Sequence, residues 1–148
     1  MKEFTTQRLL IQTNLELTKN EILIKKEKNE NILIQPSLID LKPSKIENSG
    51  FKCCLANEPN IMVAHIAFIF QRGKTEISYG TEQEYQNRGF MTEALPACIK
   101  WIYENNYKDE IYALVNNNPY SERVLIKCGF KFDYQDKDGK WYIYSLLT

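Results

Sequence analysis

YGTEQEYQNRGFMTEAL, residues 79–95, is the most informative segment of this 148-residue chain. A strand-like segment ends here in a short polar turn, and Gly89 then opens an amphipathic helix whose apolar or small residues recur at helical spacing, at Met91, Ala94, Leu95, Cys98 and Ile102. The first N–H groups of a helix have no partner within it, and the helix dipole favours negative charge at that end. Gln86 to Met91 therefore predict a cradle for a phosphate or diphosphate, with Arg88 as a charge clamp; an ordinary strand-to-helix turn is the alternative.

Composition excludes several classes of protein. The chain is 43% hydrophobic and 26% charged, as expected for one soluble globular domain spanning residues 1–148. Its 19 basic and 19 acidic residues cancel, which disfavours nucleic acid as a partner. No apolar run approaches the roughly 20 residues of a membrane helix, and the N-terminus is too polar for a signal peptide. The cysteines lack metal or disulfide spacing, so we expect reduced thiols, no metal and a cytoplasmic protein.

The first third of the chain is the part that periodicity describes least well. Residues 8–12 predict a strand. Residues 15–28 and 31–41 are compatible with either helix or strand, and Pro43 to Gly50 indicate a loop.

The remaining two thirds give clearer signals. Residues 51–56 and 61–70 predict an antiparallel pair joined by a turn at 57–60, followed by a strand from Glu76. His65, the only histidine, is expected to be a hydrogen-bonded interior residue of the second strand, with a proton relay as the alternative. A helix over 89–105 contains Pro96, and a strand follows at 111–115. The next helix has Asn118 as its N-cap and Gly129 as its left-handed C-terminal residue, and a hairpin of 131–134 and 141–147 closes the chain.

Two motifs in this region resemble those of the GNAT superfamily of N-acetyltransferases. Gln86-Asn87-Arg88-Gly89-Phe90-Met91 is similar to the family's acetyl-CoA signature, Gln/Arg-x-x-Gly-x-Gly/Ala, with Met91 as a departure at the last position. Asn118-Pro119-Tyr120-Ser121, followed by Gly129-Phe130, is similar to the Asn-x-x-Ser…Gly-Phe pattern of the branch that acetylates ribosomal-protein N-termini. The resemblance spans Glu76 to Phe130 and implies a mixed α+β fold, a central, mostly antiparallel twisted sheet with two splayed parallel strands and flanking helices. Residues 15–50 are shorter and more irregular than the paired helices usual there, which shape the acceptor pocket.

The resemblance also implies how acetyl-CoA would be held. The pantetheine arm would lie between the two splayed strands, here 76–81 and 111–115, and Tyr79, Gly80 and Thr81 would offer it main-chain partners. The diphosphate would be held by Gln86, Asn87, Arg88, Gly89, Phe90 and Met91. Asn118 would contact the arm, a role compatible with that of an N-cap.

The catalytic residues follow from the same resemblance. Many relatives protonate the leaving thiolate with a tyrosine seven positions after the Asn, and Leu125 stands there in this chain. Ser121 is then the expected proton donor, although a first-turn residue bonding local backbone is an equal alternative. Glu76 is the expected general base, ahead of Glu82 and Glu84 in the turn.

The function implied is direct transfer of an acetyl group from acetyl-CoA to a primary amine, either a protein N-terminus or a small molecule. A catalytically weak acyl-CoA sensor or interaction module is the alternative, motivated by Leu125 and the short segment 15–50. A nucleotide-binding domain is disfavoured, because the chain lacks a Gly-x-x-x-x-Gly-Lys-Ser/Thr run. The sequence leaves the acceptor and the oligomeric state open, a homodimer included.

Overall fold

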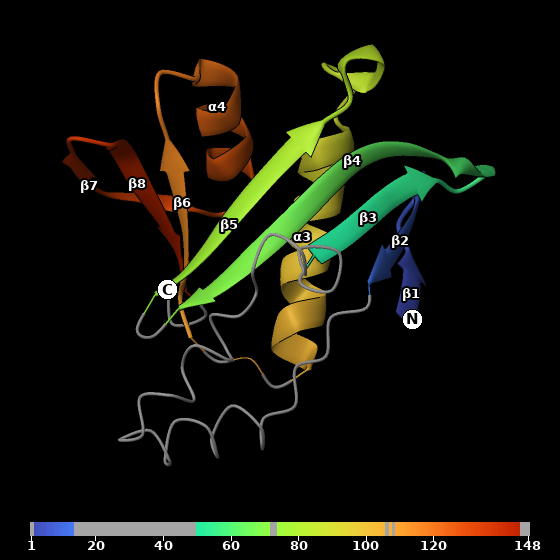
Figure 1. Ribbon diagram of the computed structural model, residues 1–148, viewed down its shortest axis with the longest axis horizontal. Coiled ribbons are helices and arrows are strands. Elements are labelled where there is room, and N and C mark those ends of the chain that lie inside the picture. The colour runs from blue at the N-terminus through green and yellow to red at the C-terminus, as the bar shows by residue number, and fades with distance from the viewer. Residues whose placement is uncertain (1, 14–49, 72–73, 106, 108, 146–148) are drawn as a thin grey trace.

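The computed structural model describes residues 2–13, 50–71, 74–105, 107 and 109–145. Within these residues the chain forms one eight-stranded sheet and two α-helices (Figure 1). The strands are β1 (Lys2–Thr5), β2 (Leu9–Thr13), β3 (Gly50–Leu55), β4 (Glu58–Gln71), β5 (Lys74–Thr81), β6 (Ile111–Val115), β7 (Lys131–Asp136) and β8 (Gly139–Tyr144). The expectations for residues 15–28 and 31–41 concern residues outside the described ones, and so does the loop expected over 43–50, except for Gly50, which begins β3.

The sheet is antiparallel except at one place. Its spatial order is β1-β2-β3-β4-β5-β6-β8-β7, and only β5 and β6 run parallel. Parallel neighbours need a crossover, and here helix α3 (Phe90–Glu104) supplies it between the end of β5 and the start of β6. The expected fold, a mostly antiparallel sheet with one parallel pair, is confirmed.

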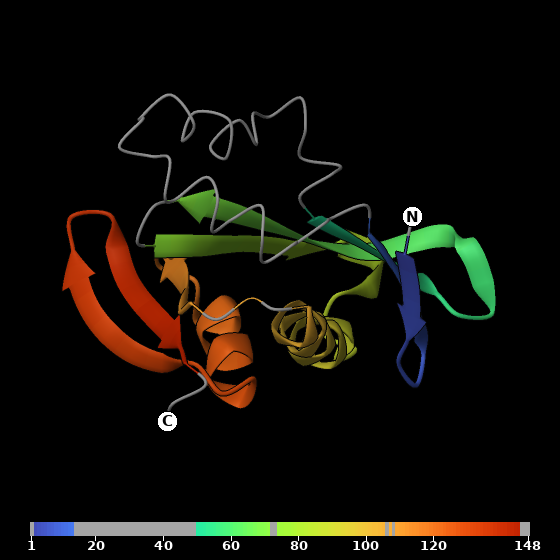
Figure 2. The same cartoon turned by 90° about the horizontal axis from the view of Figure 1, so that it is seen from below.

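Helices α3 and α4 (Pro119–Lys127) lie on the same face of the sheet (Figure 2). The buried face of α3 has the spacing that the sequence predicted and consists of Phe90, Met91, Ala94, Leu95, Cys98, Ile99 and Ile102. These side chains join those of the central strands in one hydrophobic core. Burying a large apolar side chain stabilises a protein by about 1.5–3 kcal/mol, so this interface fixes the helix against the sheet. Neither helix is long and apolar enough to cross a membrane.

Helix α4 begins and ends at the residues that the sequence marked. The Asn118 side chain accepts a hydrogen bond from the Ser121 N–H at 3.1 Å, and Pro119 occupies the first helical position. At the other end Gly129 has a φ of 96°, the left-handed conformation that glycine adopts most readily. The start of α4 is therefore held in one place relative to β6.

One strand was missed and two local expectations were wrong. Strand β1 was not predicted, because its only large apolar residue is Phe4; that ring stacks on Trp101 of α3, with centroids 6.2 Å apart. The turn between β3 and β4 is shorter than expected, since β4 already begins at Glu58. His65 is exposed rather than interior.

Candidate active site

Strands β5 and β6 are paired only where they begin. Their register pairs are Thr75–Ile111, Glu76–Tyr112 and Ile77–Ala113. Beyond these, the described residues show no pairing between the two strands, although each stays paired on its outer side, β5 to β4 as far as Thr81 and β6 to β8 as far as Val115. Figure 1 shows the two strands diverging toward their arrowheads. The splayed parallel pair that we expected is confirmed.

One hydrogen bond tells which groups of β5 face this gap. The N–H of Glu82 donates to the carbonyl of Val63 in β4 at 2.8 Å. Gly80 stands two residues before Glu82 and is paired in the same register with His65 of β4. Main-chain groups of successive strand residues point alternately to the two sides. Gly80 therefore turns its main-chain groups toward β4, whereas Tyr79 and Thr81 turn theirs toward the gap. An extended ligand can pair with such groups as an added strand would.

The Tyr79 side chain joins β5 to the first turn of α4. Its hydroxyl donates to the carbonyl of Ser121 at 3.2 Å, on the helix side of the sheet. Burial raises the pKa of Tyr79 to about 12, so the phenol stays protonated and keeps donating at neutral pH. This contact sets the position of α4 beneath the gap.

The loop before α3 contains two residues in left-handed conformation. The 3-10 helix η3 (Gln83–Tyr85) follows β5, and Asn87 and Gly89 then have φ values of 63° and 79°. The first i to i−4 hydrogen bond of the helix is donated by the N–H of Glu93 to the Gly89 carbonyl, at 3.0 Å. No described side chain caps the helix start. The N–H groups of residues 90–92 are thus open to a ligand, in the arrangement that binds anions.

The side chains of the 86–91 motif point in different directions. Gln86 Nε2 donates to the last carbonyl of β5 at 3.2 Å, and the Arg88 guanidinium lies 5.4 Å from the centroid of the Tyr85 ring. Phe90 and Met91 are buried in the core. Only their main-chain groups can meet a ligand, so Met91, the departure from the family motif, leaves the surface of the loop unchanged.

A cavity of about 240 Å³ lies between the start of α3 and the side of α4. It is lined by Asn87, Gly89, Thr92, Tyr120, Arg123, Val124 and Lys127. Arg123 and Lys127 bring two positive charges beside the open helix start. Sequence reasoning missed both, although their i, i+4 spacing places them on one face of α4, and that spacing was the available signal.

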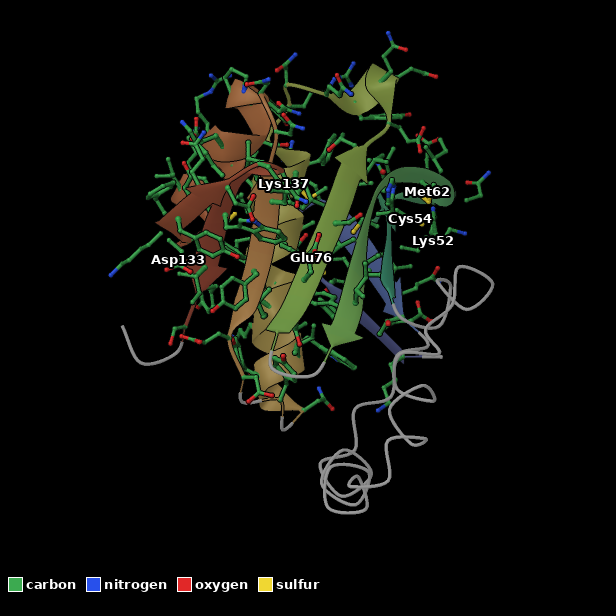
Figure 3. All side chains as sticks on the ribbon, turned by 60° about the vertical axis from the view of Figure 1, so that its left-hand side comes forward. Lys52, Cys54, Met62, Glu76, Asp133 and Lys137 are labelled. Atoms are coloured by element: carbon green, nitrogen blue, oxygen red, sulfur yellow. The ribbon has the colours of Figure 1, made fainter. Side chains whose placement is uncertain are left out.

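The two catalytic candidates lie on opposite sides of the sheet. Ser121 stands in the first turn of α4, half-buried, with its N–H bonded to Asn118. Leu125, at the position where many relatives have a tyrosine, is fully buried in the core. Glu76 belongs to the second of the three β5–β6 pairs, just before the gap opens. Figure 3 shows Glu76 on the front of the sheet, with α3 behind it.

His65 in β4 lies on the same face of the sheet as Glu76. His65 is the register partner of both Lys52 in β3 and Gly80 in β5, so the three residues share this face. A Cβ added at Gly80 would meet the His65 ring, with Cε1 at 3.0 Å. The absence of a side chain at Gly80 therefore lets the imidazole lie over β5.

Comparison with known proteins agrees with this geometry. The chain matches the acetyltransferase (GNAT) domain over residues 26–131. Its structure is similar to that of a GNAT-family acetyltransferase from Bacillus anthracis, with 20% identity and a TM-score of 0.67 over 97% of this chain and 98% of that one. A search of the curated proteins gave no significant match.

Two further solved structures are similar. One is the ribosomal-protein-S5-alanine acetyltransferase from Vibrio fischeri, with 14% identity and a TM-score of 0.63 over 97% of this chain and 94% of that one. The other is AAC(6')-Ib in complex with paromomycin and acetyl-CoA, with 12% identity and a TM-score of 0.60 over 95% of both chains. At these identities the likeness concerns the fold.

Because the domain match covers more than half of its length, the chain belongs to the GNAT family of acetyltransferases. Proteins of this family use acyl-CoA as the donor of the group that they transfer. The structural neighbours of this chain include ribosomal-protein acetyltransferases.

Proposed function

We propose that the chain is a cytoplasmic N-acetyltransferase that moves the acetyl group of acetyl-CoA directly to a primary amine, with residues 1–148 forming one acetyltransferase domain. The observation that carries the proposal is the unpaired gap between β5 and β6 leading to an uncapped, glycine-opened helix. The gap offers main-chain partners to an amide-bearing arm, and the helix start offers N–H groups to a diphosphate.

The diphosphate would lie in the cavity between the start of α3 and the side of α4. The main-chain N–H groups of residues 87–91 would contact it, with Asn87 and Gly89 shaping the loop and Arg88 supplying a charge. Arg123 and Lys127, which line the same cavity, add charge-assisted hydrogen bonds. Gln86 would act by holding the loop in place, because its side chain is bonded to the end of β5 and its N–H donates to the Gln83 carbonyl at 3.4 Å.

The pantetheine arm would run along β5 toward the closed end of the gap. Tyr79 would supply its main-chain groups and Thr81 its N–H, because the Thr81 carbonyl already accepts from Gln86. The space over Gly80 is filled by the His65 ring. The Asn118 side chain uses its oxygen as the N-cap, so its amide NH₂ stays available to the arm. Tyr79 is the first residue after the last β5–β6 pair whose N–H faces the gap, and this N–H would polarise the thioester carbonyl.

Acetyl-CoA supplies the acetyl group as an activated thioester. Glu76, next to the closed end of the gap, would accept the proton that the amine loses as its nitrogen bonds to the carbonyl carbon. The Ser121 hydroxyl would donate a proton to the sulfur as the carbon–sulfur bond breaks and would take one from water in its place, so that no alkoxide remains. Aligned reactants and two placed proton carriers are what a direct transfer needs.

The test is a thiol-release assay with acetyl-CoA and two panels of primary amines, short peptides with free N-termini and small amines. We expect turnover with members of at least one panel. The structures of the two neighbours named above motivate one panel each, since one is a ribosomal-protein acetyltransferase and the other was solved with paromomycin. No thiol release with any amine, in a chain that binds CoA, would contradict the enzyme assignment.

A CoA-binding sensor is the second candidate, because Leu125 is fully buried and carries no proton donor. It predicts that CoA raises the melting temperature while turnover stays at background across both panels. The same two measurements on one sample therefore separate the candidates.

A further inference from the structure

Arg8, which follows the turn after β1, is bound to the start of α3. Its main-chain N–H donates to Glu93 Oε2 and its Nε to Glu93 Oε1, both at 2.8 Å. The Thr6 hydroxyl donates to the same carboxylate. The guanidinium lies 4.1 Å from the centroid of the Phe90 ring, and Nη1 donates to the Arg88 carbonyl at 2.9 Å. Arg8 thus contacts Arg88, Phe90 and Glu93, which all lie within residues 79–95.

The bond to the Arg88 carbonyl fixes the direction of the next amide. A trans peptide is planar, so its C=O and N–H point in opposite directions. Because Arg8 holds the Arg88 oxygen on its own side, the N–H of Gly89 points to the other side of the loop. Gly89 also lines the cavity that Arg123 and Lys127 border.

The ion pair with Glu93 has an electrostatic consequence for the same loop. A carboxylate in the first turn of α3 would repel a bound diphosphate, and Arg8 neutralises it at 2.8 Å. The Arg8 side chain is 41% exposed and that of Glu93 16%. The pair therefore also contributes to stability, whereas a fully exposed pair contributes about 0–1 kcal/mol.

We propose that Arg8 is a positioning residue for the CoA diphosphate, which turns the Gly89 N–H toward the phosphate and screens Glu93 from it. The proposal rests on the function proposed above. Arg8 itself does not touch the donor, and its effect passes through the Arg88–Gly89 peptide.

The test compares two donors, acetyl-CoA and S-acetyl-pantetheine, which has the thioester but no diphosphate. For Arg8→Ala we expect kcat/KM with acetyl-CoA to fall about ten- to a hundredfold through KM, as for loss of one hydrogen bond to a charged group. The value with S-acetyl-pantetheine should stay within twofold of wild type. For Arg8→Lys, in which one ammonium group replaces the two-pronged guanidinium, kcat/KM with acetyl-CoA should lie between the values of wild type and Arg8→Ala. Calorimetric titration of CoA provides a second readout that needs no turnover.

Lys2→Ala is the matched control, because Lys2 also places a cation of the N-terminal strands against α3, 5.6 Å from the centroid of the Trp101 ring. Lys2→Ala should leave kcat/KM unchanged with both donors. Equal losses with the two donors in Arg8→Ala, or no loss with either, would overturn the positioning role while leaving the enzyme assignment intact. If wild type neither binds CoA nor uses either donor, the proposed function fails and the role of Arg8 fails with it.

Discussion

Replacing Gly89 with alanine tests whether the left-handed turn before α3 is a ligand site. The φ of Gly89 is 79°, and a residue with a Cβ holds that conformation at a cost of about 1–2 kcal/mol. The new methyl group has room, since its nearest neighbour would be Arg8 Nη2 at 3.5 Å. Almost the whole effect of the substitution is therefore conformational.

This strain appears either in stability or in binding. If Gly89→Ala keeps the left-handed turn, the free energy of unfolding falls by about 1–2 kcal/mol, and the melting temperature drops by several degrees. If the loop relaxes instead, its amides turn away from the cavity, and CoA must restore the turn when it binds. The Kd for CoA then rises about 5- to 30-fold.

Thermal unfolding and calorimetric titration of CoA measure the two effects on the same samples. Gly129→Ala is the control, because Gly129 has a φ of 96° at the far end of α4 and its added Cβ would lie 3.3 Å from the Tyr144 ring. The control should lose stability and keep its affinity for CoA. A ligand site at Gly89 is contradicted if Gly89→Ala matches wild type in both measurements, or if Gly129→Ala loses as much affinity for CoA.

Three other predictions concern charge, proton transfer and pH. The double substitution Arg123→Gln and Lys127→Gln should weaken CoA binding about tenfold or more and make the Kd less dependent on salt. Both side chains are exposed and contribute positive charge to the cavity. Titrations of CoA at two salt concentrations check this. Ser121→Ala should lower kcat more than it raises the Kd for CoA, and unchanged kcat would remove Ser121 from the mechanism. Burial would raise the pKa of Glu93, but hydrogen bonds from Thr6 and Arg8 outweigh it and lower that pKa. A lowered folded-state pKa stabilises the fold above the unfolded value, and that contribution is lost on acidification below about pH 4. The stability advantage of wild type over Glu93→Gln should therefore shrink in acid denaturation series, and a constant gap would contradict it.

The second half of the fold could be predicted because its sequence carries local punctuation. Asn118, Pro119 and Gly129 mark the two ends of α4, and β6 is a short apolar run between polar segments. Those signals depend only on neighbours in the sequence. Strand β1 has no such signal, because Phe4 packs against the ring of Trp101, which lies 97 residues further along the chain.

The candidate site was predictable in its main chain and less so in its side chains. Gly89 and the helix after it indicated where N–H groups would be open, because that follows from helix geometry. The positions of Arg8, Arg123 and Lys127 depend on how β2, α3 and α4 pack together. His65 was expected inside because its strand is apolar, but the face it occupies is decided by register with Gly80.

A crystal structure of the chain with bound CoA would show directly where the donor lies. We expect the diphosphate against the amides of residues 89–91, and the arm paired with the main chain of Tyr79 and Thr81 between β5 and β6. CoA bound elsewhere, with β5 and β6 still parted and empty, would contradict this expectation.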